Sequence, residues 1–366
     1  MCGIAGFVND MPIDVKCPVL QRMTDMIAHR GPDSEGHYID EHAALGHRRL
    51  SIIDLGGGQQ PIYNEDGSKV ITFNGEIYNY QTLREELIAA GHTFTTKSDT
   101  EVLLHGYEQW GVDLLQRVRG MFTFVIWDKN KQELFGARDH FGIKPFYYAK
   151  MNGTFMYASE IKSLLRHPDF VKELNAEALK PYMTFQYPAI GETFFKGVYK
   201  LPEGHYFTYR DGKMDIHRYY DEDFREGKQK LGELVNSIDQ TVCDSVKAHQ
   251  IADVEVGSFL SSGVDSSYVA AVARPQHTYS IGFGKGTYNE SQQAGELAEL
   301  LKLNNTAESL TDEEAFAAFP RIQWHLDEPD SNPSCVPLYF LSALAAKDVK
   351  VVLSGEGADE LFAGRS

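Results

Sequence analysis

The chain has 366 residues, of which 42% are hydrophobic and 24% are charged, and its formal net charge is −17. This composition is typical of a globular protein, and the length exceeds what one core usually serves, so we expect about two domains. The acidic balance, without a cluster of lysine and arginine, argues against nucleic acid as a main partner. The acidity is explained more simply by solubility.

The cysteines and the hydropathy narrow the cellular setting. Cys2, Cys17, Cys243 and Cys335 lie far apart and form no C-x-x-C pair, which argues against a disulfide framework or a zinc site built from cysteines. No apolar run reaches the roughly 20 residues of a membrane helix, and no signal peptide opens the sequence. We therefore expect a cytoplasmic protein without a membrane partner, and a homodimer is left open.

The sequence begins Met-Cys-Gly-Ile-Ala-Gly-Phe. Removal of Met1 would give Cys2 both a thiol and a free α-amine. An α-amine has a pKa of about 7.7 to 8.0 and can accept the thiol proton at neutral pH, whereas a lysine amine, at about 10.4, is mostly protonated. Cys2 is thus a candidate nucleophile for acyl transfer. A small buried cysteine without chemistry is the alternative.

Strand patterns dominate the first 160 residues. We expect strands at 4–8, 43–45, 69–73, 121–127, 133–137, 146–149 and 154–158, and helices at 17–28, 80–90 and 100–110. Turn signals such as Asn152-Gly153 separate the strands. This pattern predicts an α+β sandwich of packed antiparallel sheets flanked by helices.

Several loops in this half carry polar groups suited to binding. Arg49 lies beside a turn, where a guanidinium can hold a carboxylate with two hydrogen bonds. Asn74 and Gly75 follow a strand and offer a side-chain amide and a backbone N–H, which are the donors that an oxyanion hole needs. The segment 98–101 begins a helix, and its acidic residues fit either an N-cap or a binding role.

Six motifs occur in order: M-C-G-I-A-G-F, H-R-G-P-D, R-L-S-I-I-D, N-G-E-I-Y-N, S-D-T-E-V and R-D-H-F-G-I-K-P. Together they resemble the class II glutamine amidotransferase domain, one of the N-terminal-nucleophile hydrolases, over nearly all of residues 1 to about 160. The resemblance implies that glutamine is hydrolysed to glutamate and ammonia. The roles that it implies are Cys2 as nucleophile, Asn74 and Gly75 as oxyanion hole, Arg49 with the backbone at Ile53 for the α-carboxylate, and Glu76 and Asp99 for the α-amine.

The second half has a different organisation. Helical spacing over 231–249 is followed by a strand at 254–260, a loop of serine and glycine at 261–267, and a helical stretch at 268–273. A strand, such a loop and a helix start are typical of an anion site, because backbone N–H groups and the helix dipole face the ligand. The loop lacks the lysine of a Walker motif. An ordinary capped turn is the alternative.

Two further strands, at 278–283 and 349–353, fit a parallel sheet with the first. A second polar loop, 354–360, follows the last of them, and ligands of open parallel sheets bind at strand carboxyl ends. Asp265 and Asp359 lie in the two loops and are predicted to share the Mg²⁺ that accompanies a nucleoside triphosphate.

This half resembles the synthetase domain of glutamine-dependent asparagine synthetases, an ATP-pyrophosphatase fold whose S-G-G-x-D-S loop holds pyrophosphate. Ser262 replaces the first glycine of that loop, while Gly263 is kept. The resemblance implies ATP and Mg²⁺ as cofactors, glutamine and aspartate as substrates, and Glu356 as a base toward ammonia. It implies an ATP site formed by Leu260, Ser261, Gly263, Asp265, Ser266, Ile281, Ser354 and Gly355.

We therefore expect a glutaminase domain at 1–210, a linker at 211–225 and an α/β ATP-pyrophosphatase domain at 226–366. The family continues with a helical portion that carries a lysine and other active-site groups, so we expect the second domain to be incomplete at its C-terminus. The predicted reaction joins glutamine hydrolysis to adenylation of aspartate and displacement of AMP by ammonia.

Three alternatives remain beside that reaction. The acceptor could be another acid or a lactam precursor, with residues 331–338 shaping its pocket. The chain could instead be a glutaminase alone. A silent binding module is the third, and the intact set of Cys2, Arg49, Asn74 and Asp99 opposes it.

Overall fold

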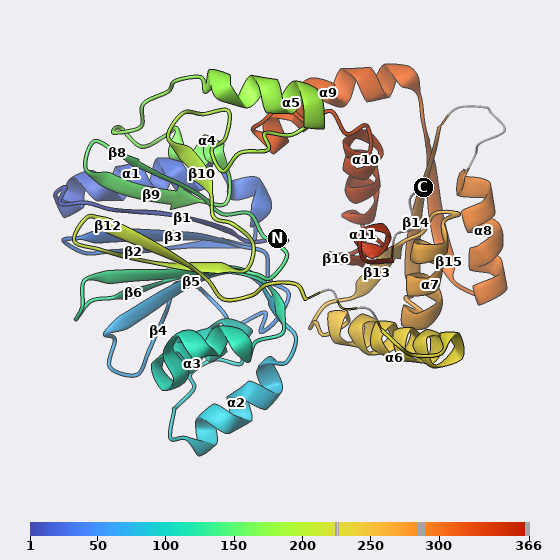
Figure 1. Cartoon of the computed structure of the whole chain (residues 1–366), viewed down its shortest axis with the longest axis horizontal. Coiled ribbons are helices and arrows are strands. Elements are labelled where there is room, and N and C mark those ends of the chain that lie inside the picture. The colour runs from blue at the N-terminus through green and yellow to red at the C-terminus, as the bar shows by residue number, and fades with distance from the viewer. Residues whose placement is uncertain (224, 226, 284–289, 363–366) are drawn as a thin grey trace. The chain divides into compact units, whose positions relative to one another are not determined.

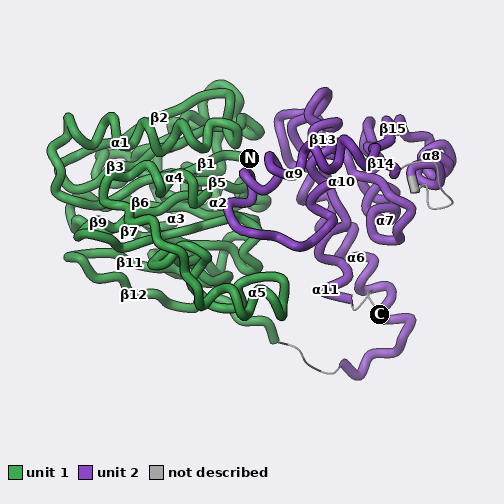
Figure 2. The backbone as a smooth tube through the Cα atoms, turned by 90° about the horizontal axis from the view of Figure 1, so that it is seen from above, with its two compact units in different colours: residues 1–224 green, residues 225–366 purple. Residues whose placement is uncertain are grey.

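The computed structural model describes residues 1–223, 225, 227–283 and 290–362. The chain divides into two compact units, residues 1–224 and residues 225–366 (Figure 2). Residues 224 and 226, at the expected linker, and residues 363–366, on which the expectation of an incomplete second domain rests, lie outside the described residues.

The first unit contains two six-stranded antiparallel sheets (Figure 1). The first sheet has the order β10-β8-β9-β1-β3-β2, formed by β1 (Gly3–Val8), β2 (Ser34–Ile39), β3 (Ala43–Arg49), β8 (Tyr147–Met151), β9 (Thr154–Ala158) and β10 (Val198–Lys200). The second has the order β12-β11-β7-β6-β5-β4, formed by β4 (Ile62–Tyr63), β5 (Lys69–Ile77), β6 (Gly120–Asp128), β7 (Glu133–Arg138), β11 (His205–Arg210) and β12 (Lys213–Arg218).

Helices cover the outer faces of this sandwich (Figure 1). The helices are α1 (Ile13–Asp25), α2 (Tyr80–Ala89), α3 (Asp99–Trp110), α4 (Ile161–Leu164) and α5 (Leu179–Phe185), with short 3-10 turns at Ala28–Arg30, Gly111–Gln116 and Ala176–Ala178. α1 and α4 pack on the first sheet, and α3 packs on the second, where Tyr107 stacks on Phe135 with ring centroids 4.5 Å apart. The predicted sandwich of antiparallel sheets flanked by helices is confirmed.

β1 is buried on both faces, and its side chains alternate between two hydrophobic cores. Ile4 packs into the core between the two sheets, whereas Ala5 and Phe7 pack against α1 and α4. Gly6 also faces the sheet core, where a Cβ would lie 2.5 Å from the hydroxyl oxygen of Tyr157. The period of two therefore fixes the register of the strand that follows Cys2.

The first helix and the linker are among the sequence expectations that differ from the structure in this unit. The first helix spans Ile13–Asp25 rather than 17–28, because the helix begins directly after Pro12 and the chain from Ala28 turns into a 3-10 segment. The expected linker at 211–225 is partly wrong, because residues 213–218 form β12 and pair with β11. The Asp211-Gly212 turn that joins these strands has positive φ at both residues, as hairpin turns of this length require.

The second unit is built on a four-stranded parallel sheet, in the order β15-β14-β13-β16. The strands are β13 (Val256–Phe259), β14 (His277–Phe283), β15 (Asn304–Leu310) and β16 (Val351–Leu353). The helices are α6 (Leu231–His249), α7 (Val264–Ala273), α8 (Glu290–Leu301), α9 (Asp312–Leu326), α10 (Cys335–Ala345) and α11 (Ala358–Phe362). The predicted parallel sheet is confirmed, while the edge strand β15 was not predicted.

Helices pack on both faces of this parallel sheet. Leu260 packs with Ala270 of α7 and Ala298 of α8, whereas the neighbouring Phe259 packs with Tyr279 and Leu344 of α10. Adjacent residues of a strand point to opposite faces, so α7 and α8 cover one face and α10 covers the other. Among the described residues, no helix is both long and apolar enough to span a bilayer.

Candidate active sites

Cys2 lies immediately before β1 and is held by backbone contacts. Its Sγ accepts from the N–H of Leu50 at 3.4 Å and lies 3.6 Å from the carbonyl oxygen of the same residue. Arg30 donates from Nε to the carbonyl oxygen of Cys2 at 3.0 Å, and its Nη1 lies 3.0 Å from Oε1 of the largely buried Glu160. The cysteine is therefore positioned by the segment after β3 and by a buried ion pair.

Burial sets the protonation of the thiol and of the chain's amino group in opposite senses. It raises the pKa of the Cys2 thiol, so the thiol keeps its proton at neutral pH. It lowers the pKa of the α-amino group, which belongs to Met1 in this chain, to about 5. An amine in these surroundings is a free base at pH 7, and removal of Met1 would move that base onto Cys2.

Asn74 and Gly75 lie on β5, opposite β6. Asn74 is 1% exposed, and neither its amide nitrogen nor its amide oxygen has a hydrogen-bond partner among the residues that the structure describes. At Gly75 a Cβ would lie 2.2 Å from the carbonyl oxygen of Met121, so no side chain fits there. A buried unpaired amide is costly unless a ligand completes it, so the pair is suited to receive an oxyanion.

Glu76 and Asp99 form a buried acidic pair close to the thiol. Burial, followed by the charge of Asp99, raises the pKa of Glu76 well above its usual range, and Oε2 of Glu76 has no partner in the described part of the chain. Burial raises the pKa of Asp99 to about 6, although its Oδ2 accepts from the N–H of Ile77 at 3.0 Å. Both carboxylates also raise the pKa of Cys2, so they lie near it. Such a pair is suited to a cationic ligand.

Helix α3 begins next to this pair. Ser98 is its N-cap, and its hydroxyl oxygen accepts from the N–H of Thr100 at 3.1 Å. The cap role therefore belongs to Ser98, which leaves the carboxylate of Asp99 to point toward β5. The cap role expected for this segment therefore falls on Ser98, and the binding role of Asp99 stays a prediction.

Arg49 is 4% exposed and is surrounded by the loop that follows β3. Its guanidinium donates to the carbonyl oxygens of Ile53 at 3.1 Å, Asp54 at 2.6 Å and Leu55 at 3.4 Å. Arg49 and the backbone of Ile53, which were predicted to hold the α-carboxylate together, therefore lie side by side. The structure adds a role that the sequence did not indicate, because the guanidinium also fixes the conformation of residues 53–55.

Lys144 was not singled out in the sequence, although it lies in the R-D-H-F-G-I-K-P motif. It is 2% exposed, and burial together with the charge of Arg30 lowers its pKa to about 8. Its ammonium donates to the sulfur of Met1, and Cys2 is among the groups that influence its charge. Its place in that motif is the sequence signal that would have identified it.

The second unit has a cavity of about 400 Å³ at the carboxyl ends of its strands. All eight predicted ATP-site residues line it, as do Glu356 and Asp359. The further lining residues include Ser334, Pro337 and Leu338, from the stretch expected to shape an acid pocket. The two polar loops predicted from the sequence therefore meet in one place.

Hydrogen bonds shape the loop between β13 and α7. The hydroxyl of Ser266 lies 2.8 Å from that of Ser261 and accepts from the N–H of Ser261 at 3.1 Å. Gly355 packs directly on this loop, since a Cβ there would lie 2.7 Å from the backbone nitrogen of Ser266. Two loops that contact each other at a glycine therefore border the cavity.

The residues present fit an ATP-bound Mg²⁺ in chemical type. Asp265 and Asp359 supply carboxylate oxygens, which Mg²⁺ prefers, and both border the cavity that the phosphate loop faces.

The comparisons with known proteins agree with this division. Residues 1–220 match the glutamine amidotransferase domain family, and residues 237–366 match the asparagine synthase family. The first unit is therefore a glutamine amidotransferase domain.

Relatives extend over both units. Asparagine synthetase [glutamine-hydrolyzing] 1 of Bacillus subtilis is 44% identical, and the match covers 100% of this chain and 59% of the relative. A putative asparagine synthetase of Mycobacterium tuberculosis is 39% identical over 100% and 60% of the two chains, and one of Methanocaldococcus jannaschii is 34% identical over 100% and 75%. The chain belongs to the glutamine-hydrolysing asparagine synthetase family. It spans about three fifths of the length of the first two relatives.

Proposed function

We propose that this protein makes asparagine from aspartate, ATP and the amide nitrogen of glutamine. The proposal is carried by the buried amide of Asn74, which has no partner among the described residues, together with a cavity that gathers every predicted ATP-site residue. Family membership supports the same reaction, in which one unit releases ammonia and the other consumes it.

In the first unit, the α-amine of processed Cys2 takes the thiol proton, and the sulfur attacks the side-chain amide carbon of glutamine. The N–H of Gly75 and the amide of Asn74 stabilise the oxyanion. The amine returns its proton to the departing ammonia, and water then hydrolyses the thioester to glutamate and restores the thiol. Glu76 and Asp99 hold the α-ammonium of glutamine, and Arg49 with the Ile53 backbone holds its α-carboxylate.

In the second unit, the side-chain carboxylate of aspartate attacks the α-phosphorus of ATP, and pyrophosphate leaves. The loop 261–267 and Ser354 bind the phosphates, and Asp265 and Asp359 would hold the Mg²⁺ that neutralises their charge. Ammonia then attacks the acyl-adenylate, Glu356 takes a proton from it, and AMP leaves as asparagine forms. We place the reaction in the cytoplasm, where the free cysteines stay reduced.

Nitrogen transfer by the full-length protein tests this proposal. The protein is incubated with glutamine labelled by ¹⁵N at the amide, Mg-ATP, and either aspartate or one of a panel of other carboxylic acids. We expect ¹⁵N-asparagine with equal amounts of AMP and pyrophosphate, formed with aspartate. If labelled product formed with a different acid instead, that acid and not aspartate would be the acceptor. Glutamate release without AMP formation from all of the acids would overturn the synthetase assignment.

A further inference from the structure

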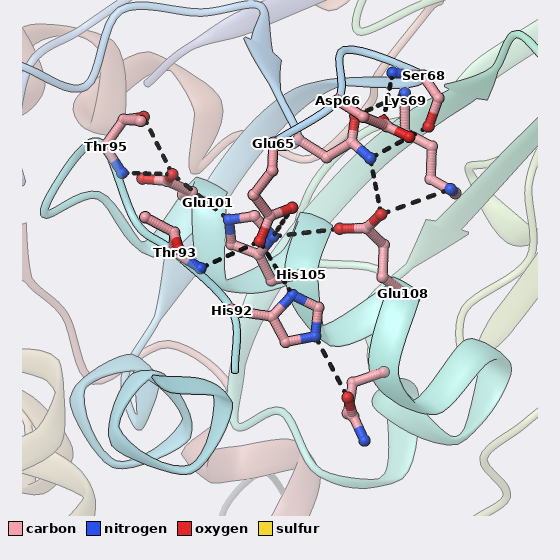
Figure 3. Close-up of polar contacts among 12 residues, drawn as sticks. Glu65, Asp66, Ser68, Lys69, His92, Thr93, Thr95, Glu101, His105 and Glu108 are labelled. Carbon is pink, nitrogen blue, oxygen red and sulfur yellow. Dashed lines mark hydrogen bonds and ion pairs between the residues drawn. The ribbon is translucent and has the colours of Figure 1, made fainter. Parts of the chain in front are cut away.

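Four potential metal ligands gather in the first unit, on the outer side of the second sheet. They are Glu65 in the turn between β4 and β5, His92 after α2, and His105 and Glu108 one turn apart on α3. Their ligand atoms all lie within 4.8 Å of one another, and Figure 3 shows the side chains converging. The proposed reaction uses none of them.

The distances within this group match a metal site. His92 Nδ1 lies 3.3 Å from Glu65 Oε1, and His105 Nδ1 lies 3.4 Å from Glu65 Oε2 and 3.2 Å from Glu108 Oε2. Bonds of about 2.0 to 2.2 Å to a tetrahedral ion place its ligand atoms about 3.3 to 3.6 Å apart. The contacts to Glu65 use its two different oxygens, and the four ligand atoms, one from each residue, lie within 4.8 Å of one another, so the side chains would have to move closer together to bind an ion.

Outer contacts aim these ligands at a common point. His105 Nε2 lies 3.4 Å from Glu101 Oε1, and His92 Nε2 lies 3.2 Å from Gln109 Oε1, so each ring directs Nδ1 inward (Figure 3). Metal-binding histidines in proteins commonly have their second nitrogen bonded to a carboxylate or carbonyl oxygen in this way.

The carboxylates are oriented in the same manner. Asn64 donates to Glu108 Oε1 at 2.7 Å, which leaves Oε2 directed at His105. Glu101, which backs His105, is itself held by backbone N–H groups of Thr95 at 2.8 Å and Thr96 at 2.6 Å. His92, His105 and Glu108 are therefore each held by hydrogen bonds outside the ligand group.

The group is also accessible. The side chain of His105 is 1% exposed, whereas that of Glu65 is 38% exposed. Glu65 and Thr93 line an adjoining cavity of about 310 Å³, and so does Glu101, which contacts the buried imidazole of His105.

We propose that Glu65, His92, His105 and Glu108 bind one divalent transition-metal ion, with Zn²⁺ as the reference ion. Imidazole nitrogens favour Zn²⁺ and its first-row neighbours over Mg²⁺ and Ca²⁺, which prefer oxygen ligands. The ion would join the β4–β5 turn and the segment after α2 to α3, the helix whose first residue is Asp99. Its role would be structural, since four protein ligands leave no open position for chemistry.

An ion-pair cluster without metal is the rival explanation. Burial alone would lower the pKa of His105, but its hydrogen bonds to Glu101 and Glu108 outweigh burial and raise the pKa to about 9. A protonated His105 could therefore hold the three carboxylates together unaided. The two explanations differ in whether an ion binds in a defined stoichiometry.

The test is a titration of the 366-residue chain carrying Cys2→Ala, which removes the thiol at the other site. Zn²⁺ binding is measured by calorimetry after treatment with a chelator, and Co²⁺ is added separately as a spectroscopic probe. His92→Gln and Glu65→Gln remove partly exposed ligands without opening the core. Gln109→Ala removes an exposed outer contact, and His42→Gln serves as control because His42 faces Asp10 at a comparable 3.3 Å elsewhere in the unit.

We expect one equivalent of Zn²⁺, a rise in melting temperature on binding, and visible Co²⁺ absorption of tetrahedral type without a thiolate band. His92→Gln and Glu65→Gln should each weaken binding at least tenfold, Gln109→Ala by about 10-fold to 100-fold, and His42→Gln not at all. Absence of a stoichiometric site, or equal affinity in His92→Gln and His42→Gln, would overturn the proposal and leave the ion-pair cluster.

Discussion

At the scale of single residues, the glutaminase site combines groups that would be unfavourable without a ligand. Asn74 keeps both polar atoms of its amide unpartnered in the described structure, and Glu76 and Asp99 are two carboxylates in one buried place. In the proposed reaction, glutamine would supply a partner for each, namely a developing oxyanion for Asn74 and an ammonium for the two carboxylates. These unpaired groups would lower the stability of the ligand-free protein and favour the binding of glutamine.

Replacement of Asn74 tests this balance. Asn74→Ala removes a buried amide that has no partner in the described residues, so the melting temperature should stay the same or rise, while kcat for glutamine hydrolysis should fall by roughly 10² to 10³. Asn64→Ala is the matched control, because its amide bonds to Ser68 and Glu108. That variant should lose stability and keep its kcat, and a shared loss of stability in both would contradict the oxyanion-hole role.

Asp99 should give the reaction a defined pH dependence. Its pKa is raised to about 6, so the carboxylate is ionised above that pH and protonated below it. Only the ionised form attracts the substrate ammonium, so kcat/KM for glutamine should rise as pH increases through about 6. Asp99→Asn should remove this rise and raise KM, with a loss of about 1.5 to 3 kcal/mol in binding.

The exposed Asp113→Asn provides the comparison for that experiment. It should keep both the KM and the pH profile of the unmodified protein. If Asp99→Asn instead lowered the melting temperature while KM and the profile near pH 6 stayed unchanged, Asp99 would have to be regarded as a structural residue of α3.

At the scale of secondary-structure elements, the second site depends on two loops that meet at Gly355. Gly355→Ala would place a methyl group 2.7 Å from the nitrogen of Ser266, which must shift the loop 261–267. Overpacking of this kind costs about 1 to 3 kcal/mol, so we expect ATP affinity to fall by a comparable free energy. Gly295→Ala on α8, with open space around its Cα, should leave ATP binding intact. Equal affinities in the two variants would contradict the assignment of this loop contact to the ATP site.

The elements that could be predicted from the sequence are those whose own residues carry a period. α6 spans Leu231–His249 as predicted, because its apolar residues repeat at helical spacing. The edge strand β15 (Asn304–Leu310) was missed because its side chains are mostly exposed and polar, so its pairing with β14 rather than any alternation stabilises it. β11 and β12 were not predicted, although the Asp211-Gly212 pair between them is a turn signal in the sequence.

In the two candidate sites, too, some residues could be predicted from the sequence and others could not. Motifs identified the residues that would touch ligand, and the structure gathers the predicted ATP-site residues around one cavity. Residues that act through others were not identifiable, since nothing in the local sequence pairs Arg30 with Glu160, 130 positions later. Contacts of such long range depend on how β1, β3 and β9 are arranged in the first sheet.

At the scale of the whole molecule, the two units have separate hydrophobic cores. Ligands should therefore stabilise them separately, because binding to a folded unit adds about 2.7 kcal/mol at 100 times Kd. In scanning calorimetry, we expect glutamate to raise the midpoint temperature of one unfolding transition and Mg-ATP to raise that of the other. A single transition whose midpoint temperature both ligands raise equally would show that the units unfold together.

The proposed glutaminase reaction depends on Cys2 as its nucleophile. The direct measurement is glutamate release from glutamine by this chain, with N-terminal processing verified by mass spectrometry, beside Cys2→Ala and Cys17→Ala. We predict release by the unmodified protein and by Cys17→Ala, whose cysteine is exposed, and none by Cys2→Ala. Glutamate release by Cys2→Ala at the rate of the unmodified protein would contradict the account.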